Sequence, residues 1–355
     1  MKALILSGGR GTRLRPITHT SAKQLVPVAN KPILFYGIEA IRDSGITDIG
    51  IVVGDTREEI KAAVGDGSAF GVKVTYIHQQ DPLGLAHAVL ISEPFLKDDS
   101  FVMFLGDNLI KDGITGLVEE FRREKPNSQI LLAEVKNPQE FGVAELAGDK
   151  IVRLEEKPRE PRSNLALVGV YMFDSHIFEA VHAIKPSPRN ELEITDAIQY
   201  LIDAKYDVRS HVITGWWKDT GKLEDMLEAN RIILSGLHKN IEGEVSDDTR
   251  VEGEVVIGKG TTVVGSTLRG PIVIGRDCII KSAFVGPFTS IADQCRVIDS
   301  EVEHSIILEG SSITGLRRRM ESSLIGRNVI VTRQPDRLPQ AYRLMVGDSS
   351  QIEVF

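Results

Sequence analysis

The stretch Ala3-Leu4-Ile5-Leu6-Ser7-Gly8-Gly9 decides the fold of the first part of the chain. An apolar run that stops at a pair of glycines is typical of a buried parallel strand ending in a tight turn. Outward from it, short apolar runs keep alternating with segments of helical periodicity. Strands are expected at 3–6, 49–53, 72–77 and 101–105, and helices at 33–44, 58–64 and 85–91. This alternation predicts a Rossmann-like α/β domain, with a mostly parallel sheet covered by helices on both faces.

In sheets of this kind, ligands bind outside the carboxyl ends of the strands. The glycine-rich turn after Leu6 and the Gly106-Asp107 pair after Leu105 both fall at that edge. Glycines there let backbone N–H groups approach phosphate oxygens closely. Their spacing matches neither the Walker pattern nor the dinucleotide fingerprint. Taken alone, the turn is equally consistent with an ordinary connection from strand to helix.

The sequence changes character from about residue 241. Helical periodicity ends, and short apolar groups such as Ile272-Val273-Ile274, Ile279-Ile280 and Val297-Ile298 recur. One apolar position about every six residues is typical of a parallel β-helix. We therefore predict the α/β domain at 1–238 and a left-handed, hexapeptide-repeat-like parallel β-helix at 239–355. An irregular C-terminal tail with a possible strand at 341–346 belongs to the second domain.

Composition narrows the functional classes. The 355 residues carry a formal net charge of -8, with 42% hydrophobic and 26% charged residues. The only dense basic run, Arg317–Arg319, is interpreted as a solvated face, so we expect no nucleic-acid partner. Cys278 and Cys295 suit buried, reduced thiols better than a disulfide framework or a metal cluster. Because no run reaches the roughly 20 apolar residues of a membrane span, we expect a cytoplasmic protein with no membrane partner.

Ordered motifs between residues 1 and 235 identify a family. They are Gly8-Gly9-Arg10-Gly11-Thr12-Arg13-Leu14, Lys23-Gln24-Leu25-Val26-Pro27-Val28, Gln79 with Pro82-Leu83-Gly84-Leu85-Ala86, Leu105-Gly106-Asp107-Asn108, Phe141-Gly142-Val143, Glu155-Glu156-Lys157-Pro158, Gly169-Val170-Tyr171, Arg189-Asn190-Glu191-Leu192-Glu193-Ile194-Thr195-Asp196 and Trp217-Lys218-Asp219-Thr220-Gly221. In this order they resemble the signature of the sugar-1-phosphate nucleotidylyltransferases, and the Lys23-Gln24 pair resembles the thymidylyltransferase branch. The C-terminal extension is similar to that of long forms in secondary-metabolite sugar pathways, such as streptomycin biosynthesis.

The resemblance implies transfer of the thymidylyl group of dTTP to glucose-1-phosphate. The sugar phosphate would attack the α-phosphorus directly, giving dTDP-glucose for deoxysugar or antibiotic glycoside biosynthesis, and pyrophosphate. Because two anions must meet, positive charge and a metal are the expected tools. Catalysis would fall to Arg13 on the β- and γ-phosphates, Lys23 near the α-phosphate, Lys157 on the sugar phosphate, and Asp107. Asp107 and Asp219 would hold Mg²⁺, which prefers carboxylate and phosphate oxygens.

The resemblance also implies two sets of binding residues. The nucleotide would contact Leu6, Gly8, Gly9, Gly11, Thr12, Arg13, Gln24, Gln79, Gly84 and Asp107. The sugar phosphate would contact Asn108, Gly142, Glu156, Lys157, Val168, Tyr171 and Arg189. The Gln24 and Gln79 amides offer both donors and acceptors to a pyrimidine. They do not separate thymine from uracil, so use of UTP stays open. Core packing is a serious alternative for Tyr171, as is an exposed ion pair for Arg189.

Two alternative functions remain. The β-helix could make the protein bifunctional as an acyltransferase, with His304 as its one candidate catalytic residue. The chain could also be a non-catalytic relative, although Arg13, Lys23, Asp107, Lys157 and Asp219 are all present. His78 and His87 lack a partner cluster, so packing or surface roles are favoured for them over a metal site. The family implies a homo-oligomer, with a tetramer favoured.

Overall fold

The computed structural model describes residues 1–9, 11–213, 215–333 and 344–353. The chain forms two compact units. The first comprises Met1–Arg10, Ser21–Leu25 and Ile33–Asp219, and the second comprises Gly11–Thr20, Val26–Pro32 and Thr220–Phe355. The second unit thus takes up two short N-terminal segments and residues 220–238 in addition to the 239–355 expected from the sequence.

The first unit contains the predicted parallel sheet. Its strands lie in the order β10-β9-β11-β6-β1-β4-β5, and the run β6-β1-β4-β5 is parallel throughout. The parallel strands are β1 (Lys2–Ser7), β4 (Asp48–Val53), β5 (Lys73–His78) and β6 (Phe101–Leu105). These bounds agree with the apolar runs in the sequence to within one residue at each end, and the Rossmann-like core is confirmed.

Beyond β6 the sheet is mixed, which the alternation of strands and helices did not predict. β11 runs antiparallel to β6, β8 and β9, and β10 runs antiparallel to β9, while β12 is parallel to β8. These strands are β8 (Ser128–Glu134), β9 (Gly142–Ala147), β10 (Lys150–Glu156), β11 (Leu165–Phe173) and β12 (Val208–Val212). A two-residue connection, Gly148-Asp149, joins β9 to β10 directly, so no crossover helix is required.

Helices cover both faces of the sheet. α1, α2 and α5 pack on the face to which Ala3 and Ile5 point, and α3, α4, α6 and α7 pack on the face to which Leu4 and Leu6 point. The helices are α1 (Ile33–Asp43), α2 (Arg57–Val64), α3 (Leu85–Ile91), α4 (Glu93–Leu96), α5 (Thr115–Glu124), α6 (Ile177–Ala183) and α7 (Ile194–Asp203), with 3-10 turns η3 (Lys23–Leu25), η4 (Ser68–Phe70) and η5 (Pro138–Glu140). Burial on both faces explains why the central strands read as continuous apolar runs.

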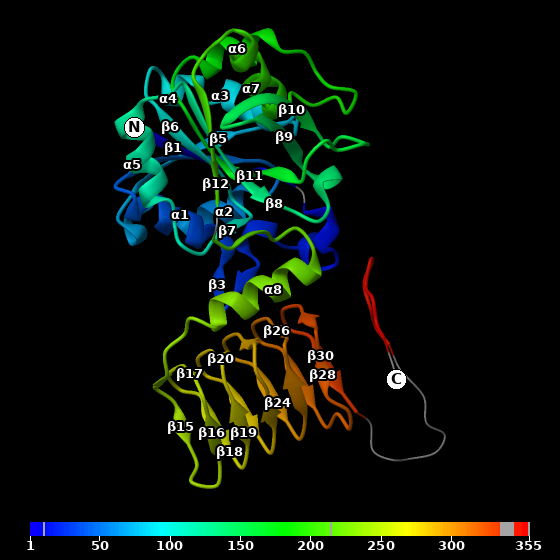
Figure 1. Ribbon diagram of the computed structural model, residues 1–355. Helices are drawn as coiled ribbons and strands as arrows, with labels where there is room; N and C mark the ends of the chain where they lie inside the picture. The colour runs from blue at the N-terminus through cyan, green and yellow to red at the C-terminus, as the bar shows by residue number, and fades with distance from the viewer. Residues whose placement is uncertain (10, 214, 334–343, 354–355) are drawn as a thin grey trace. The chain divides into compact units, whose positions relative to one another are not determined.

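The second unit contains the predicted β-helix, whose stacked coils are visible in Figure 1. In the described residues, each coil contributes one short strand to each of three parallel sheets, except the last coil, which contributes to two of them. The first sheet consists of β14 (Asn240–Ile241), β17 (Val255–Ile257), β20 (Ile272–Ile274), β23 (Thr289–Ile291), β26 (Ile306–Ile307) and β29 (Leu324–Ile325). The second consists of β15 (Glu244–Val245), β18 (Thr262–Val264), β21 (Ile279–Lys281), β24 (Arg296–Ile298), β27 (Ser312–Thr314) and β30 (Ile330–Thr332). The third consists of β16 (Arg250–Glu252), β19 (Thr267–Arg269), β22 (Phe284–Val285), β25 (Glu301–Glu303) and β28 (Met320–Glu321). The parallel pairing confirms a β-helix, and its left hand stays a prediction.

The two cysteines belong to a structural ladder of the β-helix. The Cys278 thiol lies 3.1 Å from the Ala292 carbonyl of the next coil, and the Cys295 thiol lies 3.2 Å from the Leu308 carbonyl. The Thr261 hydroxyl makes the same kind of contact, at 2.7 Å from the Gly275 carbonyl. Both thiols are free and buried, as the sequence predicted. Their role is to satisfy backbone carbonyls where the chain turns.

Helix α8 (Leu223–Leu234) and a small hairpin, β2 (Pro27–Val28) with β3 (Lys31–Pro32), are anchored within the same unit. The residue that joins them is Asn230 of α8, which is fully buried. Its Oδ1 accepts from the Ala29 N–H at 2.9 Å and from the Ser290 hydroxyl, and its Nδ2 donates to the Phe288 carbonyl at 3.0 Å. One amide therefore joins the helix, the hairpin and a coil of the β-helix.

The C-terminal tail is described only in part. Residues 341–343 of the possible strand lie outside the described residues, and residues 344–353 form neither helix nor strand. Each helix in the described part of the chain is too short or too polar to span a lipid bilayer.

Candidate active site

Glycines line the carboxyl ends of the central strands, as the sequence predicted. A Cβ atom on Gly54, after β4, would lie 3.0 Å from the Gly8 carbonyl oxygen. A Cβ atom on Gly106, after β6, would lie 3.0 Å from the Leu6 carbonyl oxygen. A side chain at either position would therefore crowd the neighbouring backbone. The Leu6 side chain is buried in the core, so only its backbone is available to a ligand.

Lys23 and Asp107 meet at this edge and form an ion pair. Both side chains are mostly buried, with relative exposures of 16% and 12%. Burial works to raise the pKa of the Asp107 carboxyl, but the Lys23 ammonium and the Asn108 amide outweigh it and lower the pKa. Asn108 Nδ2 donates to Asp107 Oδ1 at 3.2 Å. The structure thus places an ionised carboxylate and a cation where the sequence predicted phosphate and metal chemistry.

Asp219 reaches the same edge through a short antiparallel ribbon. β7 (Asn108–Ile110) pairs with β13 (Trp217–Asp219), and the register sets Asp219 opposite Asn108. The Trp217 indole locks this ribbon, since its Nε1 donates to Asn108 Oδ1 at 2.5 Å. Residues directly opposite in such a pair have Cβ atoms about 5 Å apart. Asp219 is thus placed opposite the residue that follows Asp107 in the chain, and the joint role of the two carboxylates as metal ligands stays a prediction.

The two predicted base-reading amides flank the glycine turn. Gln24 is 1% exposed, and its Oε1 is buried without a hydrogen-bond partner among the described residues. Its Nε2 lies 3.9 Å from the position that a Cβ atom on Gly9 would take. Gln79 Oε1 lies 3.2 Å from the corresponding position on Gly8. Both amides thus border the surface over Gly8-Gly9, and a buried acceptor without a partner points to a ligand.

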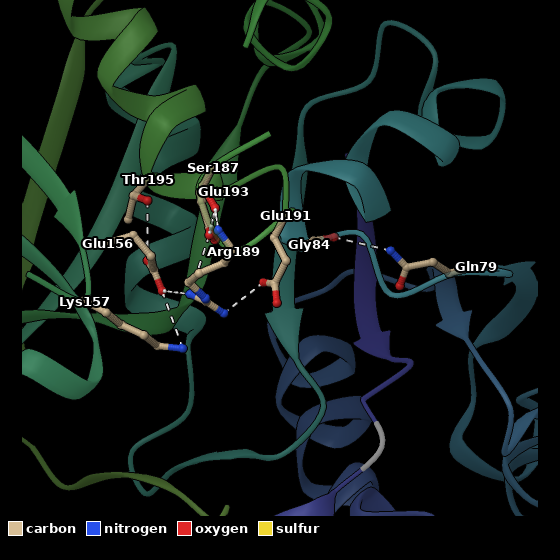
Figure 2. A network of polar contacts seen from close by, with 9 residues as sticks. All are labelled: Gln79, Gly84, Glu156, Lys157, Ser187, Arg189, Glu191, Glu193 and Thr195. Carbon is tan, nitrogen blue, oxygen red and sulfur yellow. Dashed lines mark hydrogen bonds and ion pairs between the residues drawn. The ribbon is translucent and has the colours of Figure 1, made fainter. Parts of the chain in front are cut away.

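The predicted sugar-phosphate residues form a second charged cluster (Figure 2). Arg189 contacts Glu156 Oε1 at 3.3 Å, Glu191 Oε2 at 2.9 Å and Glu193 Oε1 at 3.5 Å. Lys157 Nζ lies 3.8 Å from Glu156 Oε1. Burial and the Glu193 carboxylate raise the pKa of Glu156, while Lys157 and Arg189 act in the opposite direction. The cluster therefore holds two cations among three carboxylates, of which Glu156 is partly desolvated.

Gly142 lies against this cluster, and its lack of a side chain keeps the space open. A Cβ atom there would lie 2.6 Å from Thr195 Cγ2 and 3.1 Å from Glu156 Oε2. The Thr195 hydroxyl donates to Glu156 Oε2 at 3.4 Å. Gly142, Glu156 and Thr195 come from β9, β10 and α7, which are separate elements of the first unit.

Val168 and Tyr171 are placed differently from the charged residues. The Val168 side chain is fully buried in the core, so only its backbone is available to a ligand. Tyr171 is 4% exposed and stacks on Phe173 at 6.1 Å between ring centroids. Burial and the charge of Glu156 raise the pKa of Tyr171. Tyr171 therefore combines the core packing allowed for in the sequence analysis with a position near Glu156.

The segment that carries Gly11, Thr12 and Arg13 belongs to the second unit. Gly11 adopts a left-handed conformation with φ 63°, which favours glycine, and it precedes the 3-10 turn η1 (Thr12–Leu14). A second turn, η2 (Ile17–His19), follows, and the Thr18 hydroxyl donates to the Gly11 carbonyl at 2.6 Å. The predicted phosphate-binding roles of Gly11, Thr12 and Arg13 stay predictions.

Sequence reasoning missed three residues of these clusters. His87 lies 3.0 Å from the Gln79 amide through Nδ1, although packing or a surface role was favoured for it. Glu193 and Thr195 both contact the Glu156–Arg189 cluster. Glu193 and Thr195 belong to the matched motif of residues 189–196, whose acidic and hydroxyl positions were the available signal. No local signal distinguishes His87, because its partner comes from a separate loop.

Comparison with known proteins agrees with this arrangement. Residues 2–236 match the model of the family described as Nucleotidyl transferase. The chain is 57% identical over 355 residues to a glucose-1-phosphate thymidylyltransferase of Streptomyces griseus, and 58% identical over 356 residues to one of Streptomyces antibioticus. In both cases the match covers all of this chain and 99% of the relative. A crystal structure from Bacillus anthracis, described as a glucose-1-phosphate thymidylyltransferase, matches with a TM-score of 0.62 and 38% identity, over 65% of this chain and 94% of that one. The chain belongs to the nucleotidyl transferase family and, within it, to the group of the glucose-1-phosphate thymidylyltransferases.

Proposed function

We propose that this chain transfers the thymidylyl group of dTTP to glucose-1-phosphate, releasing pyrophosphate and forming dTDP-glucose. The observation that carries the proposal is the Lys23–Asp107 ion pair at the glycine-lined edge of the sheet, which directly precedes the β7–β13 ribbon that carries Asp219. The high identity to curated thymidylyltransferases along the whole chain supports the same substrates. A role in deoxysugar or antibiotic glycoside biosynthesis is part of this proposal.

The chemistry needs no base on the enzyme, because a sugar phosphate is already anionic and nucleophilic at neutral pH. Lys23 is suited to neutralise charge near the α-phosphate as the two anions approach. Its ammonium is held in place by Asp107, so it is directed toward this edge before substrate binds. Lys157 and Arg189 are the cations available to the sugar phosphate. We assign the β- and γ-phosphates to Arg13, by resemblance to the family.

We propose Mg²⁺ as the cofactor. In the described residues, no group of three or more His, Cys, Asp or Glu side chains could hold a metal by itself. Two carboxylates at one edge fit the usual magnesium pattern, in which phosphate oxygens and waters complete the coordination. Asp107, already facing the Lys23 ammonium, and Asp219 across the ribbon would hold it. When bound, the metal would supply positive charge to the triphosphate.

The test is pyrophosphate release by purified protein with glucose-1-phosphate and Mg²⁺, comparing dTTP, UTP, dCTP, GTP and ATP. Asp107→Asn removes the proposed metal carboxylate and should abolish turnover. Asp99→Asn is the matched control, since Asp99 pairs with Lys2 at the opposite end of β1. Dependence on dTTP, with loss in the first variant only, supports the proposal. If no nucleotide supports pyrophosphate release, or if both variants release pyrophosphate at the same rate, the proposal is refuted.

Assembly and location remain part of the proposal. The family implies a homo-oligomer, with a tetramer favoured, in the cytoplasm, and size-exclusion chromatography with light scattering measures the subunit number. The acyltransferase alternative rests on His304, whose Nδ1 lies 3.3 Å from the Ser322 hydroxyl in the β-helix. Incubation with acetyl-CoA and a hexosamine phosphate tests it directly.

A further inference from the structure

The Gln79 amide is held by two partners, and this decides which of its atoms is available to a ligand. Its Nε2 lies 3.3 Å from the Gly84 carbonyl oxygen and 3.0 Å from His87 Nδ1 (the Gly84 contact is drawn in Figure 2). A carbonyl oxygen only accepts hydrogen bonds, so the atom that faces Gly84 must be the amide nitrogen. Both N–H groups of Gln79 are thereby used within the protein.

The orientation of Gln79 fixes the state of His87. Because the amide nitrogen donates, His87 Nδ1 must accept, and the imidazole is neutral with its proton on Nε2. Burial lowers the pKa of His87, and the Asp81 carboxylate opposes this more weakly, which favours the same neutral form. His87 lies in the first turn of α3, directly after Gly84, whose φ of 105° is accessible to glycine. The loop and the helix together present the two acceptors that Gln79 meets.

With both N–H groups occupied, Gln79 presents its carbonyl oxygen Oε1 toward Gly8. We infer that His87 is a positioning residue that makes Gln79 a hydrogen-bond acceptor for the nucleotide base, and so selects bases with an N3–H donor. Thymine and uracil carry this donor, whereas N3 of cytosine is itself an acceptor. The inference rests on the proposed function and adds to it the discrimination between dTTP and dCTP.

The rejection of cytosine is expected to be strong. A base that offers an acceptor to Gln79 Oε1 leaves two lone pairs facing each other in a mostly desolvated site. If a substitution removes the acceptor atom of His87, the Gln79 amide becomes free to turn its N–H group toward the base. Removal of the acceptor should therefore weaken dTTP binding and relax discrimination against dCTP together. If His87 had only a packing role, its substitution would not change dTTP binding and the discrimination against dCTP together.

The experiment compares His87→Leu, which keeps volume and helix propensity but has no acceptor, with His87→Gln, which restores one. Initial rates are measured at saturating glucose-1-phosphate with dTTP, UTP and dCTP, and KM for glucose-1-phosphate is measured separately. In His87→Leu we expect the KM for dTTP to rise about tenfold, the value for one lost hydrogen bond, with kcat and the KM for glucose-1-phosphate within about twofold. The ratio of kcat/KM for dCTP to that for dTTP should rise at least about tenfold, and His87→Gln should recover most of both effects.

Two results overturn the inference. One is a His87→Leu enzyme whose dTTP KM and dCTP ratio stay within about twofold of the wild type. The other is a loss in both variants alike, affecting both substrates, which would mean a structural role. If the wild-type enzyme itself does not use dTTP, the proposed function fails and the His87 inference falls with it. An active wild type with an unchanged His87→Leu variant refutes only the inference.

Discussion

Asn230→Ala removes the amide that joins α8, the β2–β3 hairpin and a coil of the β-helix. The substitution leaves three polar groups without their partner, namely the Ala29 N–H, the Phe288 carbonyl and the Ser290 hydroxyl. Asn230 and Ser290 are both fully buried. Each buried group left unsatisfied costs about 1–3 kcal/mol, so three of them with some relaxation lower the free energy of unfolding by about 3–5 kcal/mol.

Ser290→Ala is the matched control, because it deletes one of the three partners and leaves Asn230 its other two bonds. We expect it to cost about 1 kcal/mol in the wild-type background. In the Asn230→Ala background it should cost nothing, or stabilise, since it removes a hydroxyl that has already lost its acceptor. The two substitutions are therefore strongly non-additive, as expected for residues in one hydrogen-bond network.

Urea unfolding followed by far-UV circular dichroism measures the free energies. Hydrogen exchange by mass spectrometry locates the change, which should appear in peptides covering residues 27–32 and 286–292. A loss below about 1 kcal/mol for Asn230→Ala would show that water replaces the amide at little cost. An equal cost of Ser290→Ala in both backgrounds would show that the network does not act as a unit. Either result refutes the reasoning.

Three further predictions concern the site and the thiols. Gly142→Ala places a Cβ atom 2.6 Å from Thr195 Cγ2, so the KM for glucose-1-phosphate should rise about tenfold while the KM for dTTP is unchanged; an unaltered glucose-1-phosphate KM in initial-rate kinetics contradicts this. Asp219→Asn should lower kcat/KM about 100-fold at saturating Mg²⁺, and activity within threefold of the wild type would exclude Asp219 as a metal ligand. Burial raises the pKa of the Cys295 thiol to about 12 and also raises the pKa of Cys278, so both thiols stay protonated at pH 8; neither should react with Ellman's reagent until urea unfolds the β-helix, and rapid labelling of the folded protein would contradict the buried ladder.

Local sequence patterns predicted the helices and strands well where burial requires apolar residues. The helix expected at 85–91 and the strand expected at 101–105 occur with those bounds. The six-residue period likewise predicted the β-helix, because each short strand buries one or two side chains per turn of the coil. The antiparallel strands β9, β10 and β11 were not predicted, since strand direction depends on which neighbour completes the sheet.

The sequence by itself determined the family, the parallel core, the β-helix and the identities of the charged and amide residues, because motif order and hydrophobic period are local properties of the chain. Only the tertiary structure decided which of these residues meet. The β7–β13 ribbon, held by a hydrogen bond between residues 109 positions apart, brings Asp219 opposite Asn108, the residue after Asp107. The burial of the Val168 side chain in the core and the contact between His87 and Gln79, which joins a loop to a helix, were also decided by the tertiary structure. Hydrogen bonds and burial across separate elements set these positions, and no local period encodes them.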